Sequence, residues 1–193
     1  MTICLVGSEM CIRDSHHIAH AASCYYSSGF RDSAIITHDG FGNGFSYHSG
    51  LVLYGENNHV YPLSPNHLSI GTLYKSVAIM LNLGGFGEGK LMGLAPYGKP
   101  HFFNKDFVEN WFGVGRRFKK SDLPRLWKEY CYATANKMGY DMSALGVQDR
   151  ITEPINADIA ASTQKLFEEC YLYTAQMSHS LLAKSGINTN NLC

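Results

Sequence analysis

The stretch from Asn156 to Lys184 is the strongest constraint that the sequence places on the fold. No proline or glycine interrupts it, and Ser185 and Gly186 follow it as a stop signal. Several side chains recur along one stripe at helical spacing: Ile159, Thr163, Leu166, Phe167, Cys170, Tyr173, Met177 and Leu181. The pattern predicts a long helix over 156–184, followed by a loop that enters a strand at Cys193.

The first third of the chain is typical of a helix followed by strands. Residues 16–28 tolerate a helix and end before Gly29, which predicts a helix closed by a left-handed glycine. The run SAIITHDG, residues 33–40, indicates a buried strand that ends at a turn. Two further runs, 45–54 and 59–63 with a hinge at 55–58, predict an antiparallel meander.

After Pro65 the helical pattern returns. Apolar residues at helical spacing predict a helix within 69–83, and the glycine-dense segment beyond it has room for a short helix closed by Pro96 and Gly98. The segment 99–155 is mixed, with a weaker helical signal at 123–138, and we interpret it as a variable insertion.

Composition argues against several classes of function. The 193 residues include sixteen Lys or Arg and sixteen Asp or Glu, so the chain lacks the basic excess of a nucleic-acid binder. No run of about 18 apolar residues could cross a membrane, and we find no signal-peptide pattern, so we expect a cytoplasmic protein. The six scattered cysteines form no Cys-x-x-Cys pair, which favours reduced thiols.

The opening residues, 1–15, differ in character from the rest of the chain. They show no clear helical or strand period, and from Cys4 to Ser15 they resemble the peptide that translated sequencing-adapter DNA encodes. We therefore expect residues 1–15 to be non-native and the natural gene to extend upstream.

Histidines concentrate in the first third and suggest a metal site. His16 and His20 lie four residues apart on the predicted helix, so their rings share one face and could chelate one ion. The spacing alone fits two ordinary polar histidines as well. Asp39 favours the metal, because an acid at the end of a buried strand is well placed to enter a site. Two histidines and one carboxylate favour iron(II) or another divalent ion over a closed zinc site.

Two glycine-rich segments are candidate ligand-binding turns. In DGFGNG, residues 39–44, the glycines at Gly42 and Gly44 let backbone N–H groups approach an anion, although an ordinary turn between strands is the commoner explanation. In GEGKLMGLAPYG, residues 87–98, the backbone around Glu88, Gly89 and Lys90 can approach a ligand, and a solvated charged loop is the alternative. Lys90 lacks the surrounding pattern of a P-loop lysine.

Four segments, taken in order, resemble the carbamoyltransferases of the NodU/CmcH type: HHIAHAASCYYSSGF, AIITHDGFGNG, SIGTLYKSVAIMLNLGGFGEGKLMGLAPYG and ADIAASTQKLFEE. The resemblance covers residues 16–98 and 156–193, and EGKLMGLAPYG is its most specific element. It implies that residues 16–193 are a partial α/β domain, namely an actin-like ATPase domain of the ASKHA, ribonuclease H-like class. That domain would be truncated at both ends and would lack the YrdC-like domain of the family.

The resemblance also implies a function. Family members make carbamoyl-adenylate from carbamoyl phosphate and ATP, with Mg as the partner of ATP, and move the carbamoyl group to a hydroxyl of a sugar or secondary metabolite. By motif position, the iron ligands would be His16, His20 and Asp39, and the residues bordering the nucleotide would be Gly42, Gly44, Glu88, Gly89 and Lys90. We expect the fragment itself to be inactive. Two alternatives stay open, an ATP-binding phosphotransferase-like protein of the same fold and a non-catalytic binding remnant.

Overall fold

The computed structural model describes residues 9–39, 49–66, 70–111 and 122–193, with side chains from His16 onward. The chain divides into two compact units. Unit 1 comprises the residues up to Ser69 together with Tyr173–Cys193, and unit 2 comprises Ile70–Leu172.

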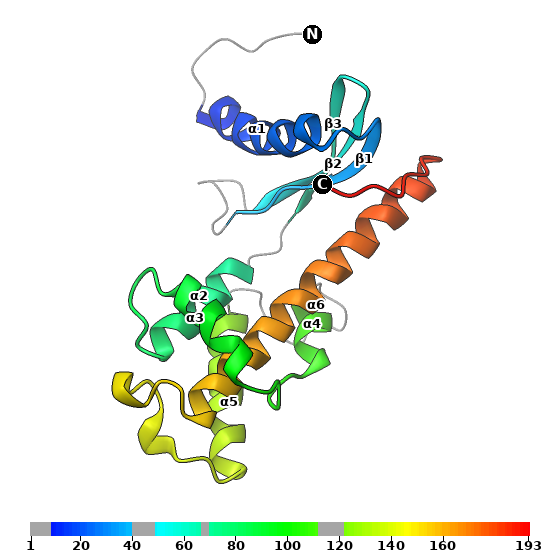
Figure 1. The fold of residues 1–193 in the computed structure, drawn as a ribbon. Coiled ribbons are helices and arrows are strands. Elements are labelled where there is room, and N and C mark those ends of the chain that lie inside the picture. Colours follow the sequence, from blue (N-terminus) through cyan, green and yellow to red (C-terminus); the bar gives the residue numbers. More distant parts are fainter. Residues whose placement is uncertain (1–8, 40–48, 67–69, 112–121) are drawn as a thin grey trace. The chain divides into compact units, whose positions relative to one another are not determined.

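Unit 1 is built on a three-stranded antiparallel sheet in the order β1-β2-β3 (Figure 1). Its strands are β1 (Asp32–Ile36), β2 (Gly50–Glu56) and β3 (His59–Asn66). Asn57 takes a positive φ of 52° in the tight β2–β3 turn, a conformation that asparagine tolerates better than most residues. The predicted meander is confirmed, while residues 45–48 of its expected second strand lie outside the described residues.

The last residues of the chain extend this sheet beside β1. The backbone N–H of Ala34 donates to the Asn191 carbonyl at 3.0 Å, and the Cys193 N–H donates to the Ala34 carbonyl at 2.8 Å. Leu192 forms a parallel bridge with Ala34. The predicted entry into a strand at the end of the chain is therefore confirmed, and the strand direction is parallel to β1.

Helix α1 (Glu9–Ser28) lies across one face of the sheet (Figure 1). Four buried side chains form the core between them: Ala21, Tyr25, Ile35 and Leu53. The helix ends where predicted, and Gly29 follows with a φ of 74°. Its start differs from the predicted His16 and falls at Glu9, because no proline or glycine between 9 and 15 stops the helix.

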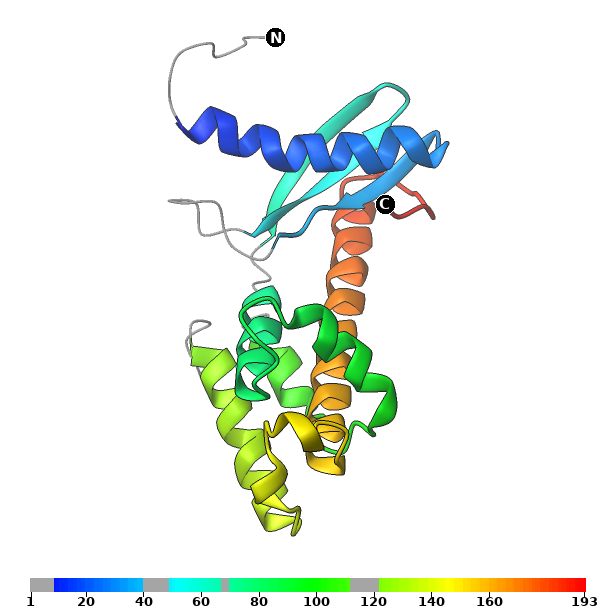
Figure 2. The same ribbon diagram turned by 60° about the vertical axis from the view of Figure 1, so that its left-hand side comes forward.

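Unit 2 is helical, and Figure 2 shows its helices grouped along the first half of α6. It contains α2 (Ile70–Met80), α3 (Glu88–Leu94), α4 (Lys105–Trp111), α5 (Leu123–Lys137) and the first part of α6 (Pro154–Lys184). Short 3₁₀ turns among the described residues of this unit are η1 (Ala95–Tyr97), η3 (Met142–Ala144) and η4 (Gln148–Arg150). The helices predicted at 69–83, before Pro96 and at 123–138 are confirmed.

The segment 99–155 contributes directly to the core of unit 2. Phe102 and Trp127 are fully buried, and the Trp127 indole N–H donates to the Thr163 hydroxyl at 3.0 Å. This bond satisfies a polar group that would otherwise be buried without a partner. The hydrogen bond ties α5 to α6 inside the core.

Helix α6 confirms the predicted element, but its buried stripe departs from the predicted one in the second half. Ile159, Thr163, Leu166 and Cys170 are buried, whereas Met177 is 51% exposed and Leu181 38% exposed. The buried residues there are Thr174, Ser178 and Leu182. The two halves belong to different units, so the face that each half buries is set by different neighbours.

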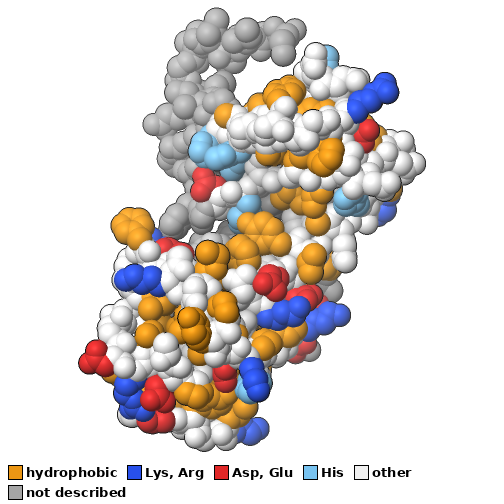
Figure 3. Space-filling model, in the orientation of Figure 1, with side chains coloured by type: hydrophobic (Ala, Val, Ile, Leu, Met, Phe, Trp, Pro, Cys, Tyr) orange, Lys and Arg blue, Asp and Glu red, His pale blue; other side chains and the backbone are white. Residues whose placement is uncertain are grey.

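The equal numbers of acidic and basic residues, and the prediction of reduced thiols, can be compared with the structure. Figure 3 shows positive and negative side chains interspersed over unit 2 on the face drawn. Among the described residues, Cys24, Cys131, Cys170 and Cys193 are free thiols. Within the same residues, no helix has both the length and the apolar character needed to cross a membrane.

Candidate metal centre

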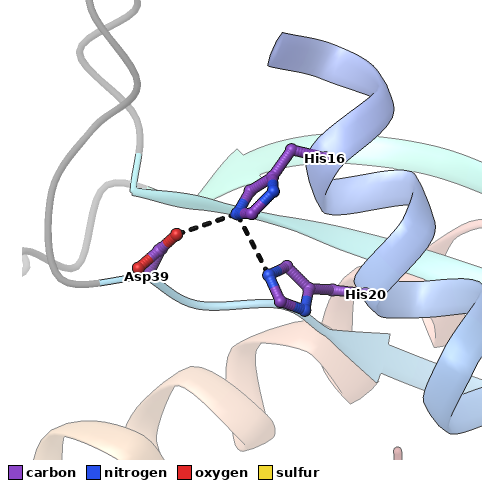
Figure 4. Close-up of side chains that lie close together, drawn as sticks. All are labelled: His16, His20 and Asp39. Atoms are coloured by element: carbon purple, nitrogen blue, oxygen red, sulfur yellow. Dashed lines mark hydrogen bonds and ion pairs between the residues drawn. The ribbon is translucent and has the colours of Figure 1, made fainter. Parts of the chain in front are cut away.

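Helix α1 brings two imidazole rings together at its exposed side. His16 and His20 are one turn apart, and their ring centroids lie 4.4 Å apart at an interplanar angle of 82°. The two Nε2 atoms are 3.0 Å apart (Figure 4). Both histidines therefore direct the same kind of nitrogen to one point, as the sequence spacing predicts.

Asp39 reaches this point from the sheet. Backbone pairing continues beyond β1, since the Thr37 N–H donates to the Leu51 carbonyl at 2.9 Å and the Asp39 N–H donates to the Ser49 carbonyl at 2.7 Å. The Asp39 carboxylate oxygen Oδ2 lies 2.9 Å from His16 Nε2. Figure 4 shows the carboxylate and both rings converging. The ligand atoms of the three residues all lie within 4.8 Å of one another.

Contacts beneath the helix fix the position of the two histidines. The Tyr25 ring packs directly on Gly55, where a Cβ would come within 2.7 Å of three ring carbons. The Tyr25 hydroxyl donates to the carbonyls of Arg31 at 2.8 Å and Asn57 at 3.2 Å. A side chain larger than hydrogen at position 55 would lift α1 from the sheet.

Two residues that sequence reasoning missed hold the site from below. His17 is 1% exposed, and its Nδ1 lies 3.4 Å from the Thr37 hydroxyl. Thr37 and Asp39 are two residues apart in extended backbone, so both face α1. The signal was available in the sequence, because the two-residue period of the strand places Thr37 on the same side as Asp39.

Gly50 is also part of this support. A Cβ there would overlap the carbonyl oxygen of Thr37, so only glycine allows the two strands to approach this closely. The Thr37 hydroxyl in turn accepts the Leu51 N–H at 2.9 Å. The backbone that carries Asp39 is thus held on the side away from the histidines.

Hydrogen bonds alone do not explain the close approach of the His16, His20 and Asp39 side chains. An ionised Asp39 can only accept, so His16 Nε2 must carry the hydrogen that bonds Asp39 Oδ2. A ring nitrogen that carries a hydrogen has no lone pair with which to accept from His20 Nε2. A cation between them would attract all three ligand atoms. Neighbouring ligands in a six-coordinate set at about 2.1 Å from the ion are about 3.0 Å apart. The spacings of 2.9 Å from His16 to Asp39 and 3.0 Å from His16 to His20 fit a divalent ion.

The exposure of the triad favours a site with open positions. The His16 and Asp39 side chains are 45% and 42% exposed, so solvent or a ligand can reach the point where they converge. Burial lowers the pKa of the neighbouring His38 to about 4, against the opposing effect of the Asp39 charge. His38 is consequently neutral near pH 7 and places no competing positive charge beside Asp39.

The remaining predicted site residues are those expected to border a nucleotide. Gly42 and Gly44 lie outside the described residues. Glu88, Gly89 and Lys90 form the first turn of α3 in unit 2, with Gly89 and Lys90 exposed. A Cβ at Gly89 would meet no atom within 4 Å, so ligand approach there is sterically free. The nucleotide-binding role of this segment stays a prediction.

Gly87, at the start of the same segment, has a packing role. A Cβ there would lie 2.7 Å from the Leu83 carbonyl oxygen and side chain. Gly87 is buried and serves the packing of the turn before α3. Gly89 and Gly93 are the glycines of this segment that face open space.

Comparison with known proteins decides the family. The model described as carbamoyltransferase N-terminus matches residues 8–193, nearly the whole chain. The chain belongs to this carbamoyltransferase family. The match runs through the segment 99–155, and it includes all three residues of the metal cluster and the α3 segment.

Curated relatives place this carbamoyltransferase segment within longer proteins. It is 46% identical to nodulation protein NolNO of Sinorhizobium fredii over 45% of the chain and 12% of that protein. It is 37% identical to nodulation protein NolO of Bradyrhizobium diazoefficiens over 49% of the chain and 17% of that protein. An uncharacterized protein of Synechocystis is 35% identical over 93% of the chain and 29% of its own length. The chain thus spans less than a third of the relatives it matches.

Proposed function

We propose that this chain is the metal-binding part of an enzyme that transfers a carbamoyl group to a hydroxyl of a sugar or secondary metabolite. The observation that carries the proposal is the convergence of His16, His20 and Asp39, in a chain that belongs to the carbamoyltransferase family. The carbamoyl group would come from carbamoyl phosphate through carbamoyl-adenylate, with ATP and Mg as further requirements.

The three side chains would hold iron(II) or a similar divalent ion. Such an ion acts as a Lewis acid that can polarise a carbonyl oxygen. Two neutral imidazoles and one carboxylate contribute a single negative charge, so they leave half of the charge of a divalent ion uncompensated. The rigid mounting of α1 through Tyr25 keeps both imidazoles at fixed distance from Asp39.

We further propose that unit 1 is part of an actin-like ASKHA domain. An antiparallel meander that gains a parallel strand after a helical crossover, at Leu192 beside Ala34, supports an open α/β sheet. The α3 segment with Glu88, Gly89 and Lys90, together with Gly42 and Gly44, would border the nucleotide. The enzyme would act in the cytoplasm without nucleic acid.

The test uses the full-length product of the gene. We would measure ATP consumption with and without carbamoyl phosphate, and carbamoyl transfer to a panel of alcohols, for the wild type, His20→Ala and His59→Ala. His59 is an exposed histidine of β3 outside the cluster and serves as the control. The proposal predicts transfer that His20→Ala abolishes and His59→Ala retains.

Other results would favour the alternatives. ATP consumption that needs no carbamoyl phosphate would indicate a phosphotransferase-like activity. Metal binding without turnover of any kind would indicate a binding protein.

A further inference from the structure

Unit 2 contains a cavity of about 530 Å³, separate from the residues of the metal cluster. It is bordered by residues within 97–101, the turn at 138–140 and the segment 152–158 that begins α6. Its volume falls within the range of about 300–1,000 Å³ that is typical of small-molecule sites. Its walls combine aromatic surface with a few polar side chains.

A buried carboxylate organises the wall of this cavity. Asp158 is only 7% exposed, and both of its oxygens are used. Oδ1 accepts the backbone N–H of Lys99 at 2.7 Å, and Oδ2 accepts the Tyr140 hydroxyl at 2.6 Å. A Cβ at Gly98 would overlap the Ala157 carbonyl, so this part of the wall lies directly on α6. The carboxylate is therefore held rigidly.

The hydrogen-bond network also orients His101. The Tyr140 hydroxyl gives its only hydrogen to Asp158, so it can only accept from the His101 Nδ1 that lies 3.1 Å away. Asp158 Oδ2 is 3.3 Å from the same nitrogen. In its neutral form, His101 thus carries its hydrogen on Nδ1. Its Nε2 is left as a hydrogen-bond acceptor for a ligand in the cavity that His101 lines.

The pKa of Tyr140 supports this direction of donation. Burial, together with Asp158, raises the pKa of Tyr140 to about 12, so the phenol keeps its hydrogen near neutral pH. The Tyr140 ring also packs against the buried Phe102, with centroids 5.4 Å apart. Both partners of His101 are fixed before a ligand arrives.

The charges of the lining favour a neutral ligand. Asp158 has no oxygen left to chelate a cation, and its charge beside the single cation of the lining, Lys99, disfavours a phosphate. Lys99 can donate hydrogen bonds to hydroxyl groups, and Thr152 can donate to them or accept from them. Tyr97 is 75% exposed and offers an aromatic face to the C–H groups of a sugar ring.

We propose that this cavity is a binding site for a neutral, hydroxyl-rich small molecule such as a sugar, with His101 Nε2 accepting a hydrogen bond from a ligand hydroxyl. The proposal is independent of carbamoyl transfer, and its tests use neither a carbamoyl donor nor a metal ion. The competing explanation is that the Asp158 network serves only to join the 97–101 segment to α6.

The first experiment determines the tautomer of His101 by side-chain nitrogen NMR of the 193-residue chain. The proposal predicts that the neutral ring carries its hydrogen on Nδ1 and leaves Nε2 without one. Tyr140→Phe removes the hydroxyl and keeps the ring, and it should weaken this preference. A hydrogen on His101 Nε2 in the wild type would overturn the proposal.

The second experiment titrates the chain with methyl glycosides of the common hexoses, with inorganic phosphate as a charged comparison. At least one glycoside should shift the His101 Nε2 signal and the amides of Lys99 and Thr152. His101→Ala should weaken that binding about three- to tenfold, the value of one hydrogen bond, and His59→Ala should leave it unchanged. No shift with any glycoside, equal weakening by His59→Ala, or binding of phosphate alone would overturn the proposal.

Discussion

Replacing Gly55 by alanine tests how α1, and with it the histidine pair, is held above the sheet. The new Cβ would lie 2.7 Å from three carbons of the Tyr25 ring, where ordinary contact begins at 3.4 Å. The ring cannot swing aside, because it is 1% exposed and its hydroxyl is bonded to the carbonyls of Arg31 and Asn57. Overpacking of this kind costs about 1–3 kcal/mol, and we expect unit 1 to lose that much stability.

The same substitution at Gly93 provides the control. A Cβ there would meet nothing within 4 Å, and Gly93 lies inside α3. Alanine should stabilise that helix by about 0.5–1 kcal/mol, so the two variants are expected to have opposite signs. Urea unfolding gives the stability of each variant, and amide hydrogen exchange shows in which of the two units the change occurs. Unchanged protection of α1 and β2 amides in Gly55→Ala would refute the proposed mounting of the helix.

Other contacts lead to three further predictions. Thr163→Val leaves the buried Trp127 N–H without its acceptor and should cost about 1–3 kcal/mol in urea unfolding, whereas Thr163→Ser, which keeps the hydroxyl, should cost less. Gly50→Ala should displace the Thr37 carbonyl and weaken divalent-ion binding at Asp39 without altering a ligand, and a calorimetric affinity equal to the wild type would contradict this. Burial is the main cause that raises the pKa values of Tyr74, Tyr140 and Tyr171 to about 12. Stability should therefore fall as the pH rises from about 10 to about 12, because the folded chain keeps phenol protons that the unfolded chain releases. Thermal unfolding at a series of pH values, together with tyrosinate absorbance, checks this.

The convergence of His16, His20 and Asp39 could be predicted from the sequence because each part of it depends on a local pattern. Helical periodicity places His16 and His20 on one face, and the end of a strand places Asp39. Gly29 and Gly186 both take a positive φ at the helix ends where the sequence predicts them. Such signals need no knowledge of which elements touch.

Features that depend on contacts between distant segments could not be predicted. The packing of the Tyr25 ring on Gly55 and the close contact of Leu83 with Gly87 arise only when the chain has folded and these residues meet. The same holds for the change of buried face along α6, because a helical stripe gives no information about which neighbour covers each half. Asp158 carries a weak signal, since a carboxylate between alanine and isoleucine in a helix must find buried partners.

Metal binding by the chain itself tests the central claim most directly. Anaerobic titration calorimetry with iron(II), joined to X-ray absorption of the complex, should show one ion per chain with imidazole nitrogen and carboxylate oxygen ligands. His20→Ala should abolish binding, Asp39→Asn should weaken it while the fold is retained, and His59→Ala should leave it unchanged. No binding by the folded wild type, or equal binding by the wild type, His20→Ala and Asp39→Asn, would contradict the proposed site.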